Sequence, residues 1–417
     1  MKLYRIYPIS SALFSILFLL ALAEKAKGQA SEKKVREHIL FLASDQLEGR
    51  APGTKGEKMA AEYISSQFKK YGLKKKGSKG YFQHFHYTER PHAHHKDGNG
   101  TQRKGQNILG FLDNGATRTM VIGAHYDHLG HEDGRGSSLE ADPTGKIHNG
   151  ADDNASGVAG LLELARIFTE NDTKEPVNFL FMAFSAEEAG LIGSKYFLEH
   201  PTIPLKKISC MFNMDMIGRL RDSTQSLSVG GAATSPVWIP MTKQLNRDFR
   251  LVFDSAGLGP SDHASFYLKD IPVLHFFSGT HSDYHKASDD AEKINFAGEV
   301  KIINYIKRIA DSTTMLDSIP FTKTKSSEKK VSAFKVTLGI MADYAFGGPG
   351  VKVDGVSPGK AAEKAGLMAG DLIMKIGEWE IKDIYSYMEV LGKFSKGQKT
   401  TAQILRGGLS LEKEVVF

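Results

Sequence analysis

The chain has 417 residues, of which 41% are hydrophobic and 24% charged, and these ordinary values exclude a disordered, collagen-like or polytopic membrane protein. Its length predicts about two to three domains. The single cysteine, Cys210, excludes an intramolecular disulfide framework and a CxxC zinc site, so any metal site must rest on His, Asp and Glu. Because Cys210 lies in an apolar run, we interpret it as a buried packing residue.

The first thirty residues predict a secretory signal. Lys2 and Arg5 give a basic start, an apolar run covers residues 9–23, and small residues stand at Gly28 and Ala30. The apolar run is shorter than the ~20 residues of a membrane span, although an uncleaved N-terminal anchor is the alternative. We therefore expect export to the periplasm or the medium, without stable membrane insertion.

The net charge argues against a dedicated nucleic-acid binder. It is +6 for the whole chain and +3 without residues 1–30, which hold four Lys/Arg and one Glu. Such a binder is expected to carry a clustered basic excess.

The mature chain begins with two predicted helices. The first covers residues 31–43, a Gly-rich loop follows at 45–56, and the second helix ends near Gly72. Residues 74–105 are basic and Gly-rich, and they carry His84, His86, His92, His94 and His95. This histidine cluster is either a metal site or a solvated loop; we interpret it as a loop because Pro and Gly interrupt it.

From residue 107 onward, apolar strands alternate with helices. Strands are predicted at 120–124, 177–184, 208–214 and 271–276, and helices at 158–168 and 296–315. This alternation predicts an α/β fold with a mostly parallel central sheet flanked by helices. In such sheets, ligands bind beyond the carboxyl ends of the strands.

Polar clusters stand at or near these strand ends. They are His125-Tyr126-Asp127, residues 150–154 (GADDN), residues 185–188 (SAEE), Asn213-Met214-Asp215 and Asp283-Tyr284-His285. Carboxylates gathered at one rim repel each other unless a cation lies between them. The pattern therefore predicts a metal site with two ions, and nitrogen and oxygen ligands favour Zn²⁺ over Co²⁺ or Mn²⁺.

Taken together, these residues resemble the co-catalytic di-zinc aminopeptidases, whose relatives include bacterial leucine aminopeptidases, glutamate carboxypeptidases and glutaminyl cyclases. The resemblance covers residues 31–316 and includes residues 47–54 (LEGRAPGT) and 259–263 (GPSDH). It implies a zinc-exopeptidase-like fold and two zinc ions per chain.

The resemblance also implies roles for individual residues. The metal ligands would be His125 and Asp215 for one ion, Glu188 and His285 for the other, and Asp152 as the bridge between them. Asp127 would orient His125. Glu187 would be the general base that deprotonates a metal-bridging water and then protonates the leaving amine. Tyr284 would stabilise the oxyanion.

Several neighbouring polar residues are expected to lie outside the ligand set. His128 and His131 follow the strand end on a Gly-rich loop, and His281 stands outside the Asp-Tyr-His cluster. Asp153 is expected to cap a helix or support a ligand, while Asp262 and His263 are expected to line the pocket.

The C-terminal part reads as a separate module. A Ser/Thr/Lys-rich linker covers residues 318–330, and residues 331–417 resemble a PDZ domain of the bacterial protease type, a small β-sandwich or barrel. The resemblance rests on residues 355–367 (GVSPGKAAEKAGL) and 369–373 (AGDLI). Residues 338–340 would form a peptide-binding edge that captures a C-terminal carboxylate, or the module only packs on the catalytic domain.

The predicted organisation is a signal peptide (1–30), a di-zinc peptidase domain (31–317), a linker (318–330) and a PDZ domain (331–417). The expected function is a secreted aminopeptidase that removes N-terminal residues from peptides. The alternatives are a carboxypeptidase-like or glutaminyl-cyclase-like enzyme on the same fold, and a non-catalytic PDZ scaffold.

Overall fold

The computed structural model describes residues 28–89, 101–132, 137–324, 336–342, 346, 348–356 and 359–417. Residues 1–27 of the predicted signal, the histidines His92, His94 and His95, and residues 325–330 of the predicted linker lie outside the described residues. No helix among the described residues is long and apolar enough to cross a membrane.

Among the described residues, nine strands form the sheet of the first domain, in the order β1-β3-β7-β4-β8-β11-β9-β10 with β2 beside β3. The pairs β4–β7, β4–β8 and β8–β11 are parallel, whereas β3–β7 and β9–β11 are antiparallel. The sheet is thus mostly parallel at its centre, as predicted. The strands are β1 (Lys74–Lys75), β2 (Phe82–Glu89), β3 (Thr101–Leu112), β4 (Thr119–His125), β7 (Asn178–Phe184), β8 (Ile208–Met214), β9 (Ser226–Gly230), β10 (Arg250–Phe253) and β11 (Val273–Phe277).

The central strands are apolar throughout because both faces of the sheet are covered. On β7, Phe179, Phe181 and Ala183 enter one hydrophobic core, while Leu180, Met182 and Phe184 enter a second core on the opposite face. Successive side chains of a strand point to opposite faces, so a strand buried on both sides needs an unbroken apolar run.

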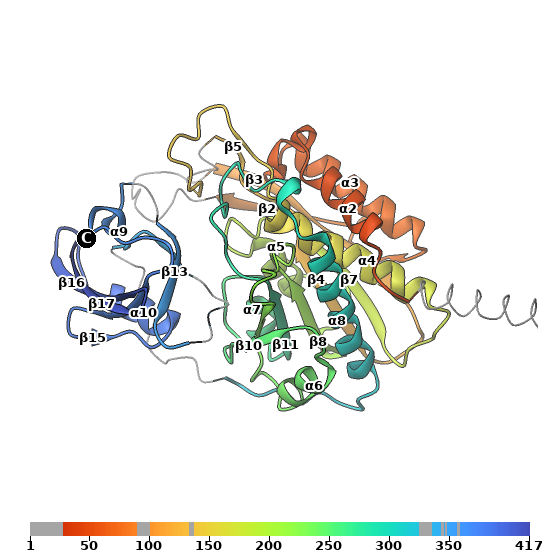
Figure 1. Cartoon of the computed structure of the whole chain (residues 1–417). Coiled ribbons are helices and arrows are strands. Elements are labelled where there is room, and N and C mark those ends of the chain that lie inside the picture. Colours follow the sequence, from red (N-terminus) through yellow and green to blue (C-terminus); the bar gives the residue numbers. More distant parts are fainter. Residues whose placement is uncertain are drawn as a thin grey trace, which may run out of the picture.

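Helices pack against both faces of the sheet (Figure 1). The first core contains side chains of α2 (Glu32–Leu42), α3 (Lys55–Lys70), α4 (Gly157–Glu170), α6 (Trp238–Leu245) and α8 (Phe296–Thr314). The second contains side chains of α5 (Ile192–Glu199) and α7 (His263–Tyr267). This arrangement leaves the carboxyl ends of β4, β7 and β8 at one common rim.

The interpretation of residues 74–105 as a loop is wrong for most of its described part. β2 pairs with β3 in an antiparallel hairpin, with Phe85 opposite Gly105. Along β2, Gln83, Phe85 and Tyr87 are buried, whereas His84 and His86 are exposed. This period of two is the ordinary signature of a half-buried strand, and the basic, Gly-rich composition concealed it. Both histidines therefore lie on the open side of the hairpin.

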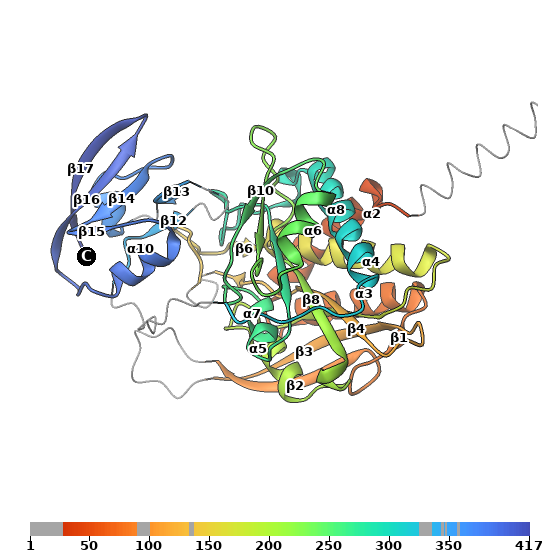
Figure 2. The ribbon, with the colours of Figure 1, turned by 90° about the horizontal axis from the view of Figure 1, so that it is seen from below.

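The C-terminal module lies beside the first domain and has its own core (Figure 2). Its described strands run in the order β12-β13-β14-β16-β17, with β15 beside β14. The predicted helix, Gly-Asp turn and apolar strand are present as α9 (Ala361–Lys364), Gly370-Asp371 and β14 (Leu372–Ile376). The remaining elements are β12 (Ile340–Ala342), β13 (Val351–Val356), β15 (Trp379–Glu380), α10 (Ile384–Leu391), β16 (Lys399–Arg406) and β17 (Leu409–Val416).

Candidate metal centre

The rim of the central sheet gathers buried imidazoles and carboxylates from separate segments. His125 is the last residue of β4, Asp215 directly follows β8, and Glu187 and Glu188 come shortly after β7. Asp153 lies in the turn at Ala151–Ser156, immediately before α4. Parallel strands place their carboxyl ends together, which is why residues up to 90 positions apart meet here.

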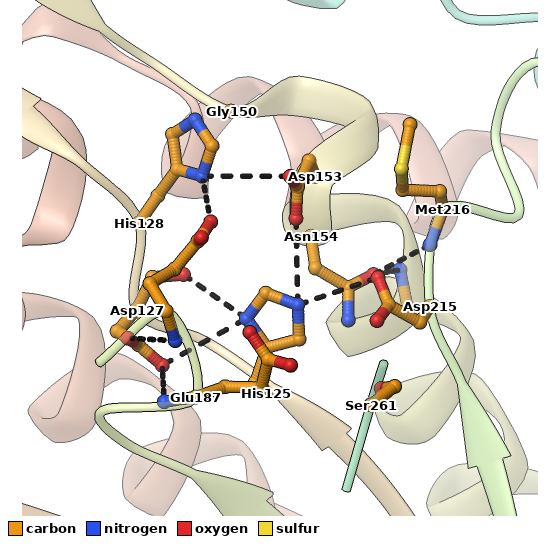
Figure 3. Close-up of polar contacts among 12 residues, drawn as sticks. His125, Asp127, His128, Gly150, Asp153, Asn154, Glu187, Asp215, Met216 and Ser261 are labelled. Atoms are coloured by element: carbon orange, nitrogen blue, oxygen red, sulfur yellow. Dashed lines mark hydrogen bonds and ion pairs between the residues drawn. The ribbon is translucent and has the colours of Figure 1, made fainter. Parts of the chain in front are cut away.

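The first donor group consists of His125, Asp153 and Asp215 (Figure 3). His125 Nε2 lies 3.4 Å from Asp153 Oδ1 and 3.3 Å from Asp215 Oδ1. The other ring nitrogen, Nδ1, lies 3.2 Å from the main-chain oxygen of Asp127 and donates to it. That hydrogen bond uses Nδ1, so Nε2 is the ring nitrogen that a metal ion held by the two carboxylates would bind.

The second donor group surrounds the other oxygen of Asp153. His285 Nε2 lies 3.3 Å from Asp153 Oδ2 and 3.2 Å from Glu188 Oε2. Its Nδ1 donates to the main-chain oxygen of Ser137 at 3.0 Å, so Nε2 is again the ring nitrogen available to a metal ion. His128 forms a group with the same two carboxylates, and its Nδ1 lies 2.8 Å from Glu188 Oε1.

Asp153, rather than the predicted Asp152, occupies the position shared by both groups. The carboxylate of Asp152 is engaged elsewhere: Oδ1 accepts from Gly218 N at 2.7 Å and from Ser156 Oγ, and Oδ2 lies 3.1 Å from His281 Nε2. The backbone is non-helical at Asp153 (φ −104°, ψ 93°), which breaks the regular helical spacing of the two side chains. The predicted bridging residue, Asp152, is therefore corrected to its neighbour Asp153.

The sequence showed an Asp-Asp pair but carried no signal for which member faces the rim. His128 was expected to lie outside the ligand set, but it lies beside the second donor group. Its position three residues after His125 was the only feature of the sequence that pointed to this location. By contrast, His131 is exposed, in agreement with its exclusion.

Asp127 is buried and holds the segment that carries Glu187. Its Oδ1 accepts from the main-chain N–H of Glu187 at 3.1 Å, and its Oδ2 lies 3.4 Å from that of Glu188. The carboxylate is 3.7 Å from His125 Nδ1, farther than the main-chain oxygen of the same residue. Asp127 thus orients His125 through its backbone and positions Glu187 through its side chain.

Arg50, from the LEGRAPGT segment, connects the loop after β4 to the turn before α4 by hydrogen bonds. The guanidinium is fully buried and donates to the main-chain oxygens of Leu42, Tyr126, Asn149 and Gly150. Tyr126 follows a predicted ligand and Gly150 opens the turn that carries Asp153. Burial lowers the pKa of Arg50 to about 10, against the opposing effect of nearby carboxylates, so the group stays cationic.

The electrostatics of the rim favour a cation between the two donor groups. Burial alone would lower the pKa of His125, but the charges of Asp215 and Glu187 outweigh this effect. The net result is a pKa well above the ordinary 6.5. Burial also lowers the pKa of His285, and Glu188 outweighs it in the same way. Carboxylates that stabilise a proton on an imidazole stabilise a metal cation at the same point.

Glu187 behaves differently from its neighbour. Burial raises the pKa of Glu187 well above 4.5, with Glu188, Asp215 and Asp262 adding to the rise and His125 opposing it. The pKa of Glu188 falls to about 2, because His285 and the hydrogen bond from His128 outweigh burial. Adjacent carboxylates with opposed pKa shifts are typical of an acid–base residue beside a ligand.

The remaining predicted residues lie around these groups. Tyr284 stacks on the ring of His285, with ring centroids 3.9 Å apart, and its role at an oxyanion stays a prediction. Asp262 is fully buried near Glu187, His263 stacks on His275, and His281 contacts Asp152. These three residues lie outside the two donor groups.

The donor set fits zinc. In the groups His125–Asp153–Asp215 and His128–Asp153–Glu188, one ligand atom per residue lies within 4.8 Å of the others, and Asp153 contributes to both. Imidazole nitrogen and carboxylate oxygen are the ligands that zinc takes in catalytic sites without thiolate. The buried Cys210, whose pKa burial raises to about 12, lies within β8 and outside both groups.

The fold and the donor groups together define an α/β domain with a candidate metal centre, joined to a small β-domain. Residues 107–309 match the model of peptidase family M28, and residues 318–416 match that of the PDZ domain. The chain therefore carries a segment of the M28 peptidase type, followed by a C-terminal PDZ domain.

Individual relatives agree with this assignment. Aminopeptidase YwaD of Bacillus subtilis is 26% identical over 287 residues, which cover 65% of this chain and 55% of the relative. The chain spans about half the length, or less, of the curated relatives it matches.

Solved structures share the fold at lower sequence identity. A glutaminyl cyclase from Porphyromonas gingivalis has a TM-score of 0.55 at 18% identity, covering 69% of this chain and 99% of the cyclase. A zinc aminopeptidase from Bacillus subtilis has a TM-score of 0.55 at 19% identity, covering 72% of this chain and 97% of the other.

Proposed function

We propose that the chain is an exported zinc aminopeptidase that binds two zinc ions and removes N-terminal residues from peptides. The observation that carries the proposal is the carboxylate of Asp153, which directs one oxygen toward each donor group. His125 and Asp215 would hold one ion with Asp153, and Glu188 and His285 would hold the other. The name of the YwaD relative supports the reaction class.

Bound zinc would polarise the scissile carbonyl and lower the pKa of water in the site. The chain's own residues would then move the protons. Glu187 would accept the proton of the attacking water and return it to the leaving amine, because it lies beside the donor groups without belonging to either. Asp127 would keep Glu187 in place through the hydrogen bond to its main-chain N–H.

The acidic surroundings also give a reason for exopeptidase selection. Glu187, Asp215 and Asp262 are electrostatically coupled in one buried region. A protonated α-amine entering this region would be attracted to the carboxylates, whereas an acetylated terminus carries no charge. The site is therefore expected to select peptides with a free N-terminus.

Digestion of a defined peptide pool by the zinc-reconstituted mature protein tests this proposal. Each peptide is offered with a free and with an acetylated N-terminus, and products are identified by mass spectrometry. Loss of single N-terminal residues from the free forms alone is the expected result. Shortening from the C-terminus would indicate a carboxypeptidase, and cyclisation of N-terminal glutamine without hydrolysis would indicate a glutaminyl cyclase.

Export is proposed on the sequence of residues 1–30. N-terminal sequencing of the protein recovered from periplasm and medium tests it. A mature terminus near Ser31 is expected, while an intact Met1 in the membrane fraction would indicate an uncleaved anchor.

We also propose that the PDZ domain binds the C-terminal end of peptide substrates along β12. Within the described residues, β12 is the end strand of its sheet. Gly339, just before it, has a positive φ of 77°, and a Cβ there would lie 2.2 Å from the Cβ of Lys360. An exposed lysine therefore stands beside the predicted carboxylate-binding segment.

The direction of β12 would lead such a peptide toward the metal centre. Ala342, at the far end of the strand, accepts a 2.6 Å hydrogen bond from Thr280 Oγ1. Thr280 precedes His281, which contacts Asp152 beside the shared Asp153. A peptide whose carboxylate lies near Gly339 would extend antiparallel to β12 and present its N-terminal part at Thr280.

Peptides of about ten residues, which extend over ~33 Å at ~3.3 Å per residue, test this arrangement. C-terminal amidation and Lys360→Glu are each expected to raise KM roughly tenfold for the long peptide and leave a dipeptide unaffected. Lys364→Glu, on the exposed side of α9, is the matched control. Equal KM values for acid and amide forms would contradict the proposal.

A further inference from the structure

His128 is a buried histidine that the proposed two-ion mechanism does not use. Its side chain is 1% exposed, and its Nδ1 lies 2.8 Å from Glu188 Oε1 and 3.9 Å from Asp153 Oδ2. Both of these carboxylates belong to the second donor group. The ring thus faces the same two carboxylates as His285, at the other oxygen of Glu188.

The local backbone fixes this orientation of the His128 ring (Figure 3). A Cβ at Gly150 would lie 2.5 Å from Cγ and Cδ2 of His128, so the absence of a side chain at Gly150 makes room for the imidazole. Gly150 also has a positive φ of 59°. The opposite ring nitrogen, Nε2, is buried and has no hydrogen-bond partner among the described residues. Nδ1 is therefore the ring nitrogen that contacts polar groups.

The spacing around the second group matches a four-coordinate ion. Ligand atoms bound tetrahedrally to zinc at ~2.0–2.1 Å are about 3.3–3.4 Å apart. His285 Nε2 lies 3.3 Å from Asp153 Oδ2 and 3.2 Å from Glu188 Oε2. His128 Nδ1 lies 2.8 Å from the other oxygen of Glu188, Oε1, and 3.9 Å from Asp153 Oδ2, and these distances fall on either side of the same value.

We propose that His128 is a fourth protein ligand, through Nδ1, of the ion in the second group. The proposal rests on the two-ion function proposed above. It makes the two metal positions unequal: His128, His285, Glu188 and Asp153 close the second, while His125, Asp215 and Asp153 leave the first one ligand short. Closed zinc sites are the structural type, and sites with an open position are the catalytic type.

The consequence is a stepwise loss of metal. The second ion would be held tightly and would support the loops after β4 and β7, while the first ion would exchange and carry the open position for substrate. A mild chelator is therefore expected to remove one ion before the other, with activity lost at the first step.

X-ray absorption spectroscopy of the two-zinc full-length mature protein tests the ligand count directly. Three imidazoles for two ions are expected, against two imidazoles if His128 is no ligand. His128→Asn is the informative variant, because its amide keeps a polar group beside Glu188 but is a poor zinc ligand. It is expected to reduce the count to two imidazoles and to weaken the tighter zinc at least ~10–100-fold, the loss typical of even outer metal-site partners.

His131→Ala, three residues away and exposed, is the matched control and should change neither quantity. Circular dichroism of the zinc-free proteins shows whether the variant folds. His128→Ala tests the same loss of zinc affinity with no polar side chain beside Glu188. Two imidazoles in the wild type, or unchanged zinc affinity in folded His128→Asn, would overturn the assignment of His128 alone. A wild type that binds a single ion would overturn the two-ion proposal as well.

Discussion

The rim of the central sheet contains several buried charged side chains close together, whereas the described part of the C-terminal module contains one. The rim buries Asp127, Asp152, Asp153 and Glu187 together with His125 and His128. In the described part of the C-terminal module, Asp371 is the one buried polar or charged side chain, and it is paired with Arg406 at 2.7 and 2.8 Å.

This difference is consistent with catalysis at the rim and peptide recognition by the C-terminal module. Burial of several like charges at one place is unfavourable unless a cation compensates them, so the rim is explained by metal binding. A domain that captures peptides by adding a strand uses main-chain groups and needs no buried charge. Predictions for the two regions therefore differ in kind: metal and turnover at the rim, stability and affinity in the module.

The largest effect is expected from the residue shared by both donor groups. Asp153→Asn should abolish binding of both ions and all peptidase activity, because one oxygen of Asp153 faces each group. Asp152→Asn is the matched control, since its retained amide oxygen still accepts from Gly218 and Ser156. Metal content by mass spectrometry checks both variants, and the opposite ranking would restore Asp152 as the bridge.

Glu187→Gln should lower kcat by about 10²–10⁴-fold, the usual contribution of a general base. Both zinc ions should remain bound, because Glu187 belongs to neither donor group. Kinetics on a dipeptide, together with metal analysis of the same sample, separate the two properties. Loss of zinc from the variant would assign Glu187 a structural role instead.

In the C-terminal module, Arg406→Met should lower stability without affecting catalysis. It leaves the buried Asp371 without the guanidinium that outweighs burial and lowers its pKa. Urea unfolding followed through Trp379, in a Trp238→Phe background, reports on this module, because the chain has two tryptophans. A midpoint equal to that of the Arg406-containing protein would contradict the account, as would a changed kcat on dipeptides.

The smallest effect concerns a buried histidine away from the rim. Burial lowers the pKa of His38 from 6.5 to about 3, and its Nδ1 lies 2.7 Å from Tyr63 Oη. The unfolded chain therefore binds a proton below pH 6.5 that the folded protein does not, and stability falls as the pH drops from 6.5 toward 3. The slope is at most about 1.4 kcal/mol per pH unit.

His38→Phe should remove this contribution. Thermal melting of both proteins at pH 7.5 and 5.5 measures it, and the wild type should lose more stability than the variant on acidification. Parallel losses would show that His38 titrates normally in the folded chain.

Sequence patterns predicted the central sheet because its strands are buried on both faces and leave unbroken apolar runs. The same rule placed the ends of β4, β7 and β8 at one rim, which is how His125, Glu188 and Asp215 were found together. Patterns failed where backbone geometry decides: the non-helical φ and ψ at Asp153 select which member of the Asp-Asp pair faces the rim. They also failed at β2, where basic residues and glycines obscured an alternation of period two.

Anomalous diffraction at the zinc edge, from crystals of the zinc-reconstituted mature protein, tests the central claim most directly. The account predicts two anomalous peaks, one on each side of the Asp153 carboxylate, with His125 and Asp215 at one peak and Glu188 and His285 at the other. A single peak, or a peak between Asp152 and His281, would contradict it.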